Sequence, residues 1–108
     1  MNEHAAARGG RIDFTRISGA ALGHSETIVR RWLPDGRRDG HEWVARNPRR
    51  SDQRLGSFKI NLQSGRWADF AAGESGGDLI SLAAYLFEMR NREAALKVAE
   101  MVGTNPYA

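Results

Sequence analysis

The segment from Gly56 to Met89 constrains the fold more than any other part of the chain. Apolar and polar residues alternate over residues 57–62, which is the period-two pattern of a strand with one buried face. Ser64-Gly65 then predicts a reversal of the chain, and the short aromatic run RWADF at residues 66–70 predicts a return strand. The sequence therefore predicts a β-hairpin in this segment.

A helix is predicted immediately after the hairpin and the glycine-rich residues 73–77. Asp78 is a suitable N-cap, and apolar residues follow it at i, i+3, i+4 and i+7, namely Leu79, Leu82, Ala83 and Leu86. Because an isolated hairpin is only marginally stable in water, we expect this helix, residues 78–89, to cover its apolar face.

The flanking residues predict further helices and one more strand. Helical spacing at residues 12–22 and 26–33 predicts two helices, the second capped by Ser25, or a single kinked helix through both. Turn residues at 33–37 and at Asp39-Gly40 precede a strand at 41–46 and a polar loop at 47–55. A last helix is predicted over residues 91–102, capped by Asn91 and stopped by Gly103.

These elements predict one α+β domain of residues 12–104. Its core would be a three-stranded antiparallel sheet with the two C-terminal helices packed on it and a helical N-terminal segment alongside. Residues 1–11 are expected to be disordered, and residues 105–108 form a tail. No apolar run is long enough for a membrane span and no signal peptide is evident, which predicts a soluble cytoplasmic protein without membrane contact.

Positive charge is concentrated in the middle of the chain. Residues 30–66 hold ten basic side chains against four acidic ones, a net charge of +6, whereas the remainder carries −3. Fourteen of the sixteen basic residues are arginines, which suit bidentate phosphate contacts, although a codon bias would also produce them. The clustering indicates a positive surface of the kind that binds nucleic acid.

The order of these elements, and in particular GRWADF followed by GESGGDLISLAAYL, resembles the N-terminal zinc-finger domain of DNA primases and of phage and plasmid primase-helicases. The similarity runs from about His41 to about Gly103. It implies a zinc-ribbon-like fold that handles single-stranded template DNA, with a primase, polymerase or helicase as a protein partner.

The residues that would hold the family's zinc ion are missing from this chain. The family carries a Cys-Pro-x-His knuckle and a later pair of cysteines, but this sequence has no cysteine and has residues 47–50, NPRR, in place of the knuckle. The second pair would fall at about residues 70–73. We therefore expect no metal and no cofactor, and hypothesise that Trp67 or Phe70, with Trp43, fills the place of the metal.

Seven residues are predicted to contact nucleic acid. Six are basic side chains of the charged block that could track a phosphate backbone, and the seventh is an aromatic that could stack on a base. They are Arg46, Arg49, Arg50, Arg54, Lys59, Arg66 and Trp67. The competing interpretation is a solvated arginine-rich loop, with the aromatic side chains in the core of a small domain.

The orientation of Trp67 depends on the register of the hairpin. A two-residue turn at Ser64-Gly65 would place Trp67 beside Leu62 in the core. A bulge that shifts the register by one residue would instead bury Phe70 and expose Trp67 beside Lys59. The sequence leaves both registers open.

Non-catalytic binding of single-stranded DNA is the function that these features predict. The glycine-rich stretch lacks a GxxxxGK[ST] pattern, and no paired carboxylates or nucleophile–base arrangement is legible, so the chain is not expected to be an enzyme. The alternative is a protein-interaction module that docks a replication partner without touching DNA.

Overall fold

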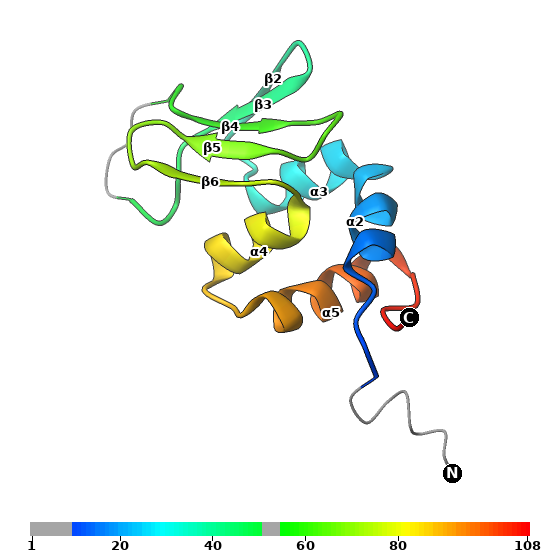
Figure 1. The fold of residues 1–108 in the computed structure, drawn as a ribbon. Coiled ribbons are helices and arrows are strands. Elements are labelled where there is room, and N and C mark those ends of the chain that lie inside the picture. Colours follow the sequence, from blue (N-terminus) through cyan, green and yellow to red (C-terminus); the bar gives the residue numbers. More distant parts are fainter. Residues whose placement is uncertain (1–9, 51–54) are drawn as a thin grey trace.

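The structure, a computed structural model, describes residues 10–50 and 55–108. Within these ranges the chain forms four helices and one five-stranded antiparallel sheet, whose strands are neighbours in chain order. The helices lie together on one side of the sheet (Figure 1). The helices are α2 (Phe14–Leu22), α3 (Ser25–Trp32), α4 (Leu79–Phe87) and α5 (Asn91–Val102). The strands are β2 (Arg37–Asp39), β3 (Glu42–Ala45), β4 (Phe58–Asn61), β5 (Trp67–Asp69) and β6 (Glu74–Gly76).

The prediction of a three-stranded sheet is wrong because both edge strands were taken for turns. Strand β2 occupies residues predicted as turns, and strand β6 lies in the predicted glycine-rich stretch. Both are short and mostly exposed, so neither has the alternation of apolar residues that marks a strand with one buried face. They are ordered by antiparallel pairing with β3 and β5. The α+β class agrees with the structure.

The hairpin register places Trp67 inside and Phe70 outside. Ile60 pairs with Trp67, and both side chains are buried against the helices. Trp67 is 5% exposed, whereas Phe70 is 73% exposed and is the most exposed large apolar side chain of the described residues. The structure has neither of the two predicted registers, because Trp67 pairs with Ile60 and not with Leu62, but it agrees with the first of them in placing Trp67 in the core.

The turn that sets this register is longer than the predicted two-residue reversal. The backbone N–H of Asn61 donates to the carbonyl of Arg66, which leaves residues 62–65 as the loop. The side-chain oxygen of Asn61 accepts from the backbone N–H groups of Gln63 and Ser64, both at 2.9 Å. Gly65 has a φ of 81°, a value that favours glycine.

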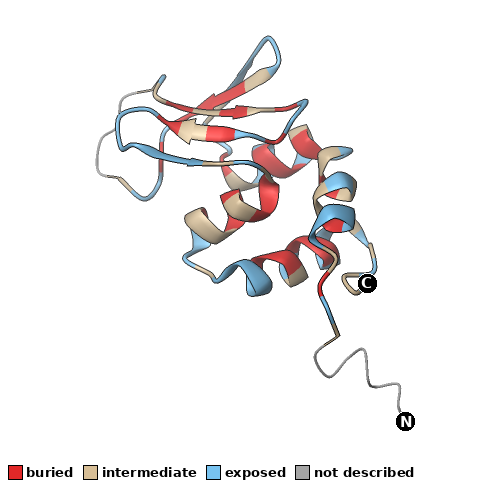
Figure 2. Ribbon diagram, viewed as in Figure 1, coloured by how far each residue is buried: buried red, intermediate tan, exposed pale blue. Residues whose placement is uncertain are grey.

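Helix α4 is central to the core, as the sequence predicts. The Asp78 carboxylate accepts from the backbone N–H of Ser81, and the Ser81 hydroxyl accepts from the N–H of Asp78, which is a capping box. The apolar side of α4 lies under the sheet, where the buried residues gather (Figure 2). The predicted cap and the predicted apolar face of this helix are therefore confirmed.

Two other predicted caps are wrong by one residue. Helix α3 includes Ser25 and has His24 at its N-cap, so the Ser25 hydroxyl is available to donate to the carbonyl of Leu62 at 2.6 Å. Helix α5 includes Asn91 and has Arg90 at its N-cap. In both cases the polar side chain that the sequence suggests as a cap lies in the first turn.

The ends of the described chain meet beside α2. This helix is separate from α3, with Gly23 and His24 between them. The predicted tail returns to the start of the domain, where Tyr107 forms an isolated bridge with Ile12 and accepts a hydrogen bond from Arg16 at 2.7 Å. No helix within residues 10–50 and 55–108 is long and apolar enough to cross a membrane.

Replacing Gly76 with alanine is expected to lower the free energy of unfolding by about 1–3 kcal/mol, the usual cost of overpacking. A Cβ at Gly76 would overlap the indole nitrogen of Trp67 and the hydroxyl of Ser81. Gly77→Ala is the matched control, because a Cβ there meets no atom within 4 Å. Urea denaturation of both variants measures the difference. Equal stabilities would contradict this packing around Trp67.

Candidate nucleic-acid interface

One face of the sheet is left uncovered by the described helices (Figure 1). Cross-strand partners share a face, and the row through Trp43, Ile60 and Trp67 points to the core. The next row, through Lys59, Ala68 and Ser75, therefore points to the opposite side. The same row continues through Val44, which is buried, to Arg37 on β2. We call the part of this surface around the β4–β5 hairpin the open face; its residues are Glu42, Lys59, Asn61, Arg66, Ala68, Phe70 and Ser75.

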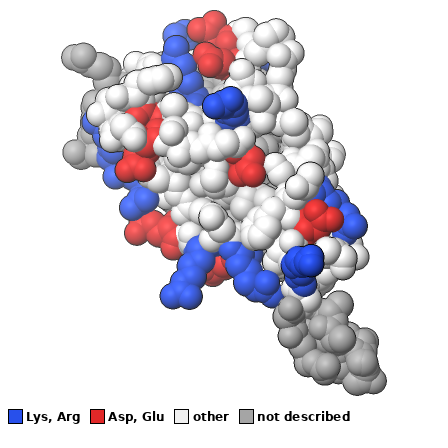
Figure 3. All heavy atoms as spheres, in the orientation of Figure 1, with Lys and Arg blue, Asp and Glu red and all other residues white. Residues whose placement is uncertain are grey.

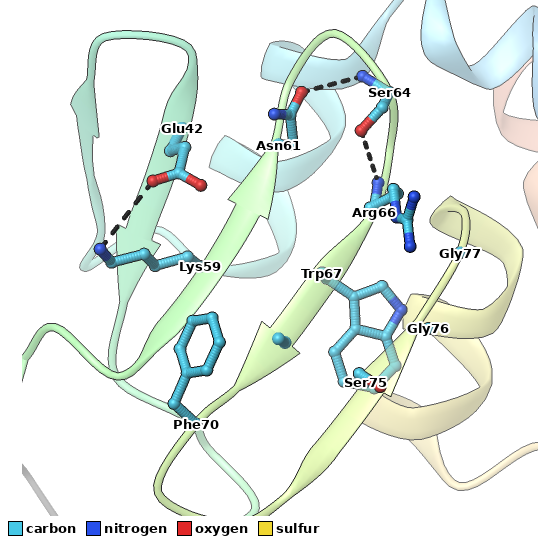
Figure 4. A pocket seen from close by; sticks show the side chains of 11 residues that line it. Glu42, Lys59, Asn61, Ser64, Arg66, Trp67, Phe70, Ser75, Gly76 and Gly77 are labelled. Atoms are coloured by element: carbon cyan, nitrogen blue, oxygen red, sulfur yellow. Dashed lines mark hydrogen bonds and ion pairs between the residues drawn. The ribbon is translucent and has the colours of Figure 1, made fainter.

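The open face contains a shallow hollow of about 530 Å³. Its lining combines small residues with two basic side chains, one carboxylate and one exposed aromatic ring (Figure 4). The lining residues are Glu42, Lys59, Asn61, Ser64, Arg66, Trp67, Ala68, Phe70, Ser75, Gly76 and Gly77. A volume in the range of roughly 300–1,000 Å³ is typical of ligand sites.

Phe70 stands at one end of the hollow on a well-defined backbone. Its N–H donates to the carbonyl of Ser57 at 2.9 Å, which extends the β4–β5 pairing by one residue. The following turn is held by Asp69, whose carboxylate accepts from the N–H groups of Ala71 and Ala72 at 3.0 and 3.3 Å. An aromatic ring fixed in this way and exposed to water is able to stack on a planar group.

Two of the predicted phosphate contacts, Lys59 and Arg66, lie beside this ring on the open face. Arg66 is exposed on the sheet side of the turn, and Lys59 is half-buried with its ammonium group 3.9 Å from the carboxylate of Glu42. Basic and acidic side chains are also interspersed over the wider surface seen in Figure 3. The open face therefore carries a small net positive charge. Its two basic side chains occupy separate positions and do not form a dense basic patch.

Arg49 and Arg50 make contacts within the protein instead. Arg49 lies over the ring of Tyr85, 4.8 Å from its centroid, and donates to the Tyr85 carbonyl at 3.1 Å. Arg50 lies 3.4 Å from the carboxylate of Asp69. Both arginines are therefore anchored on the helix side of the sheet end, away from the open face.

The two remaining predicted basic contacts are Arg46 and Arg54. Arg46 is exposed and lines a second hollow of about 200 Å³ with Pro34, Asp35 and Arg50. Arg54 lies outside the described residues. Of the five predicted basic residues that the structure describes, it thus brings Lys59 and Arg66 together at the open face.

Trp67 is a core residue rather than a surface for stacking. Its indole N–H donates to the Ser81 hydroxyl at 3.0 Å, and its ring lies 4.9 Å from that of Tyr85. Phe58 meets the ring edge-on at 6.1 Å. The exposed aromatic of the hairpin is Phe70, which was not among the predicted contacts. Asp69 points inward, so the next residue, Phe70, must point outward, but this follows only once the register is known.

A buried polar cluster links residues 47–50, the segment predicted to stand in place of the zinc knuckle, to the end of β5. Asn47 donates to the Asp69 carboxylate at 2.8 Å and to the Tyr85 hydroxyl at 2.7 Å. Asp69 is fully buried, with Arg50 on its other side. The link between residues 47–50 and the end of β5 is therefore polar, and Phe70, one of the hypothesised replacements for the metal, points away from it.

The pKa of Asp69 reflects this cluster. Burial alone would raise the pKa of the carboxyl group, but hydrogen bonds from Asn47 and from the backbone of Ala71 and Ala72 outweigh burial and lower it. The carboxylate is therefore charged at neutral pH. Among residues 10–50 and 55–108, no group of three or more histidine, cysteine or acidic residues is arranged to hold a metal ion.

Comparison of the chain with the models of known protein families and with curated proteins gives no match. The geometry of the open face is consequently the main guide to function.

Proposed function

We propose that this protein binds single-stranded DNA through the open face, without catalysing a reaction. The observation that carries the proposal is Phe70, a ring 73% exposed on the uncovered face of a sheet, with Lys59 and Arg66 on the same face. Aromatic rings that stack on bases and cations that contact the backbone are the two components of single-strand recognition. The uncovered sheet provides both on a rigid support.

Single strands are favoured over duplex DNA because an exposed aromatic ring can stack only on a base whose face is uncovered. In a duplex both faces of each base are covered by neighbouring base pairs, so Phe70 could stack only on an unpaired base. We propose that the protein acts in the cytoplasm, as a template-contacting module of a primase-helicase system or as an accessory to one. The resemblance of residues 41–103 to the N-terminal zinc-finger domain of primases supports this role.

Phe70→Ala is expected to weaken binding of a short oligothymidylate by roughly 5- to 150-fold. Loss of one stacked base costs about 1–3 kcal/mol. Fluorescence anisotropy of a labelled oligonucleotide measures the change. Because the side chain is largely exposed, the variant should unfold at nearly the same urea concentration as the wild type.

Phe14→Ala is the matched control for this substitution. Phe14 is also an exposed aromatic, 42% accessible, but it begins α2 on the helix side of the molecule. It should leave DNA binding unchanged. A similar loss in both variants, or no loss in Phe70→Ala, would contradict the proposal and favour the alternative of a protein-docking module.

A further inference from the structure

We infer that the hollow beside Phe70 is a pocket for one unpaired nucleobase, flanked by a phosphate contact on each side. This inference rests on the proposed function and makes it specific. The open face would then hold a very short segment of single strand, with one base inserted between side chains. A flat platform for a long strand would not require such a hollow.

The hollow exists because the residues at its floor are small. Ala68 occupies the middle of β5, opposite Lys59 on one neighbouring strand and Ser75 on the other. Gly76 and Gly77 continue the wall toward α4. The larger side chains lie at the rim, so that a planar ligand could reach the sheet backbone (Figure 4).

The polar groups of the hollow match the edge of a base. The carbonyl oxygen of the Asn61 side chain is engaged by the turn, which leaves its NH2 group as the donor toward a ligand. The Ser75 hydroxyl can donate or accept, and the Glu42 carboxylate at the rim accepts. Every nucleobase carries both donors and acceptors on its edge, so this mixture suits a base better than an apolar ligand.

The spacing of the side chains limits the length of strand that the open face can hold. Arg66 and Phe70 are four residues apart on one extended segment, or about 13 Å at 3.3 Å per residue. Stacked nucleotides repeat at about 3.4 Å along one strand, so the two side chains span about four nucleotides at most. Lys59 lies between them on the adjacent strand.

Ala68→Phe tests the pocket by filling it without changing the charge of the face. Aromatic residues are favourable in strands, so the variant should fold. We expect its affinity for an oligothymidylate to fall roughly tenfold or more, comparable to the loss of one stacked base. Ala71→Phe is the matched control, because Ala71 is exposed in the next turn and does not line the hollow.

A length series provides a second readout. Affinity for oligothymidylates of about two, four and eight nucleotides should rise up to four nucleotides. Beyond that length it should rise only by a statistical factor, the number of positions along the strand at which the site can bind. Unchanged or tighter binding by Ala68→Phe, or a steep rise beyond that length, would overturn the pocket while leaving single-strand binding intact. If the wild type binds no single strand at low salt, the proposed function fails, and the pocket with it.

Discussion

Replacing Asp69 with alanine is expected to lower the free energy of unfolding by about 1–3 kcal/mol, the cost of leaving a buried hydrogen-bond donor without its partner. The fully buried carboxylate accepts from Asn47, from Arg50 and from two backbone N–H groups. Without it, the buried amide group of Asn47 would lose an acceptor, whereas Arg50, which is 28% exposed, and the N–H groups of the exposed turn could turn to water. A loss of this size is a large share of the roughly 5–15 kcal/mol that stabilises a domain.

Urea denaturation followed by circular dichroism measures this loss. Asp39→Ala is the control, because Asp39 is an exposed aspartate on edge strand β2 and its removal should change the stability by less than about 0.5 kcal/mol. Similar midpoints for the two variants would mean that the polar cluster does not hold the end of the sheet.

The same carboxylate makes stability depend on acid pH. Because the pKa of Asp69 is lowered in the folded protein, its contribution is complete above the pKa of the unfolded chain and is lost as the pH falls through the folded pKa. Stability should therefore decline below about pH 4. Asp69→Asn, which cannot titrate, should show a shallower decline than the wild type over that range.

Removing Lys59 and Arg66 together is expected to abolish most of the electrostatic part of DNA binding. Each phosphate contact to a single strand contributes about 0.7 to the slope of log affinity against log salt, so the double alanine variant should have a slope smaller by about 1.4. Between about 50 and 200 mM salt, the wild type should then lose about sevenfold more affinity than the variant.

Arg92→Ala with Lys97→Ala is the matched control for this pair. It also removes one arginine and one lysine, but from exposed positions on α5, on the helix side of the molecule. Its salt slope should equal that of the wild type. An equal reduction in both double variants would indicate that net charge, rather than the open face, determines binding.

The sequence predicted the helices better than the sheet because their signals are local. The Asp78 cap and the apolar spacing after it lie within two helical turns and define α4 on their own. Strands β2 and β6 have no comparable signal, since polar edge strands are specified by their neighbours. Of the three inner strands, β4 was predicted from its alternating residues and β5 from a short aromatic run, whereas β3 has three consecutive buried residues and no alternation.

The site was predicted only in part, because contacts between residues that are distant in the sequence decide which side chains reach the open face. Clustering along the sequence grouped Arg49 and Arg50 with Lys59, but the fold turns both arginines toward Tyr85 and Asp69. Their substitution would remove contacts within the protein, so they are poor probes of DNA contact. Phe70 was missed as a contact because its exposure depends on the hairpin register, which the Asn61 turn determines.

The most direct test of the central claim is fluorescence anisotropy of a short labelled oligothymidylate, and of a duplex of the same length, at low salt. The wild type should bind the single strand more tightly than the duplex. A variant with alanine at Lys59, Arg66 and Phe70 should lose this binding, whereas one with alanine at Phe14, Arg92 and Lys97 should retain it. No binding by the wild type, or equal losses in the two triple variants, would contradict the assignment of the open face as a single-stranded DNA site.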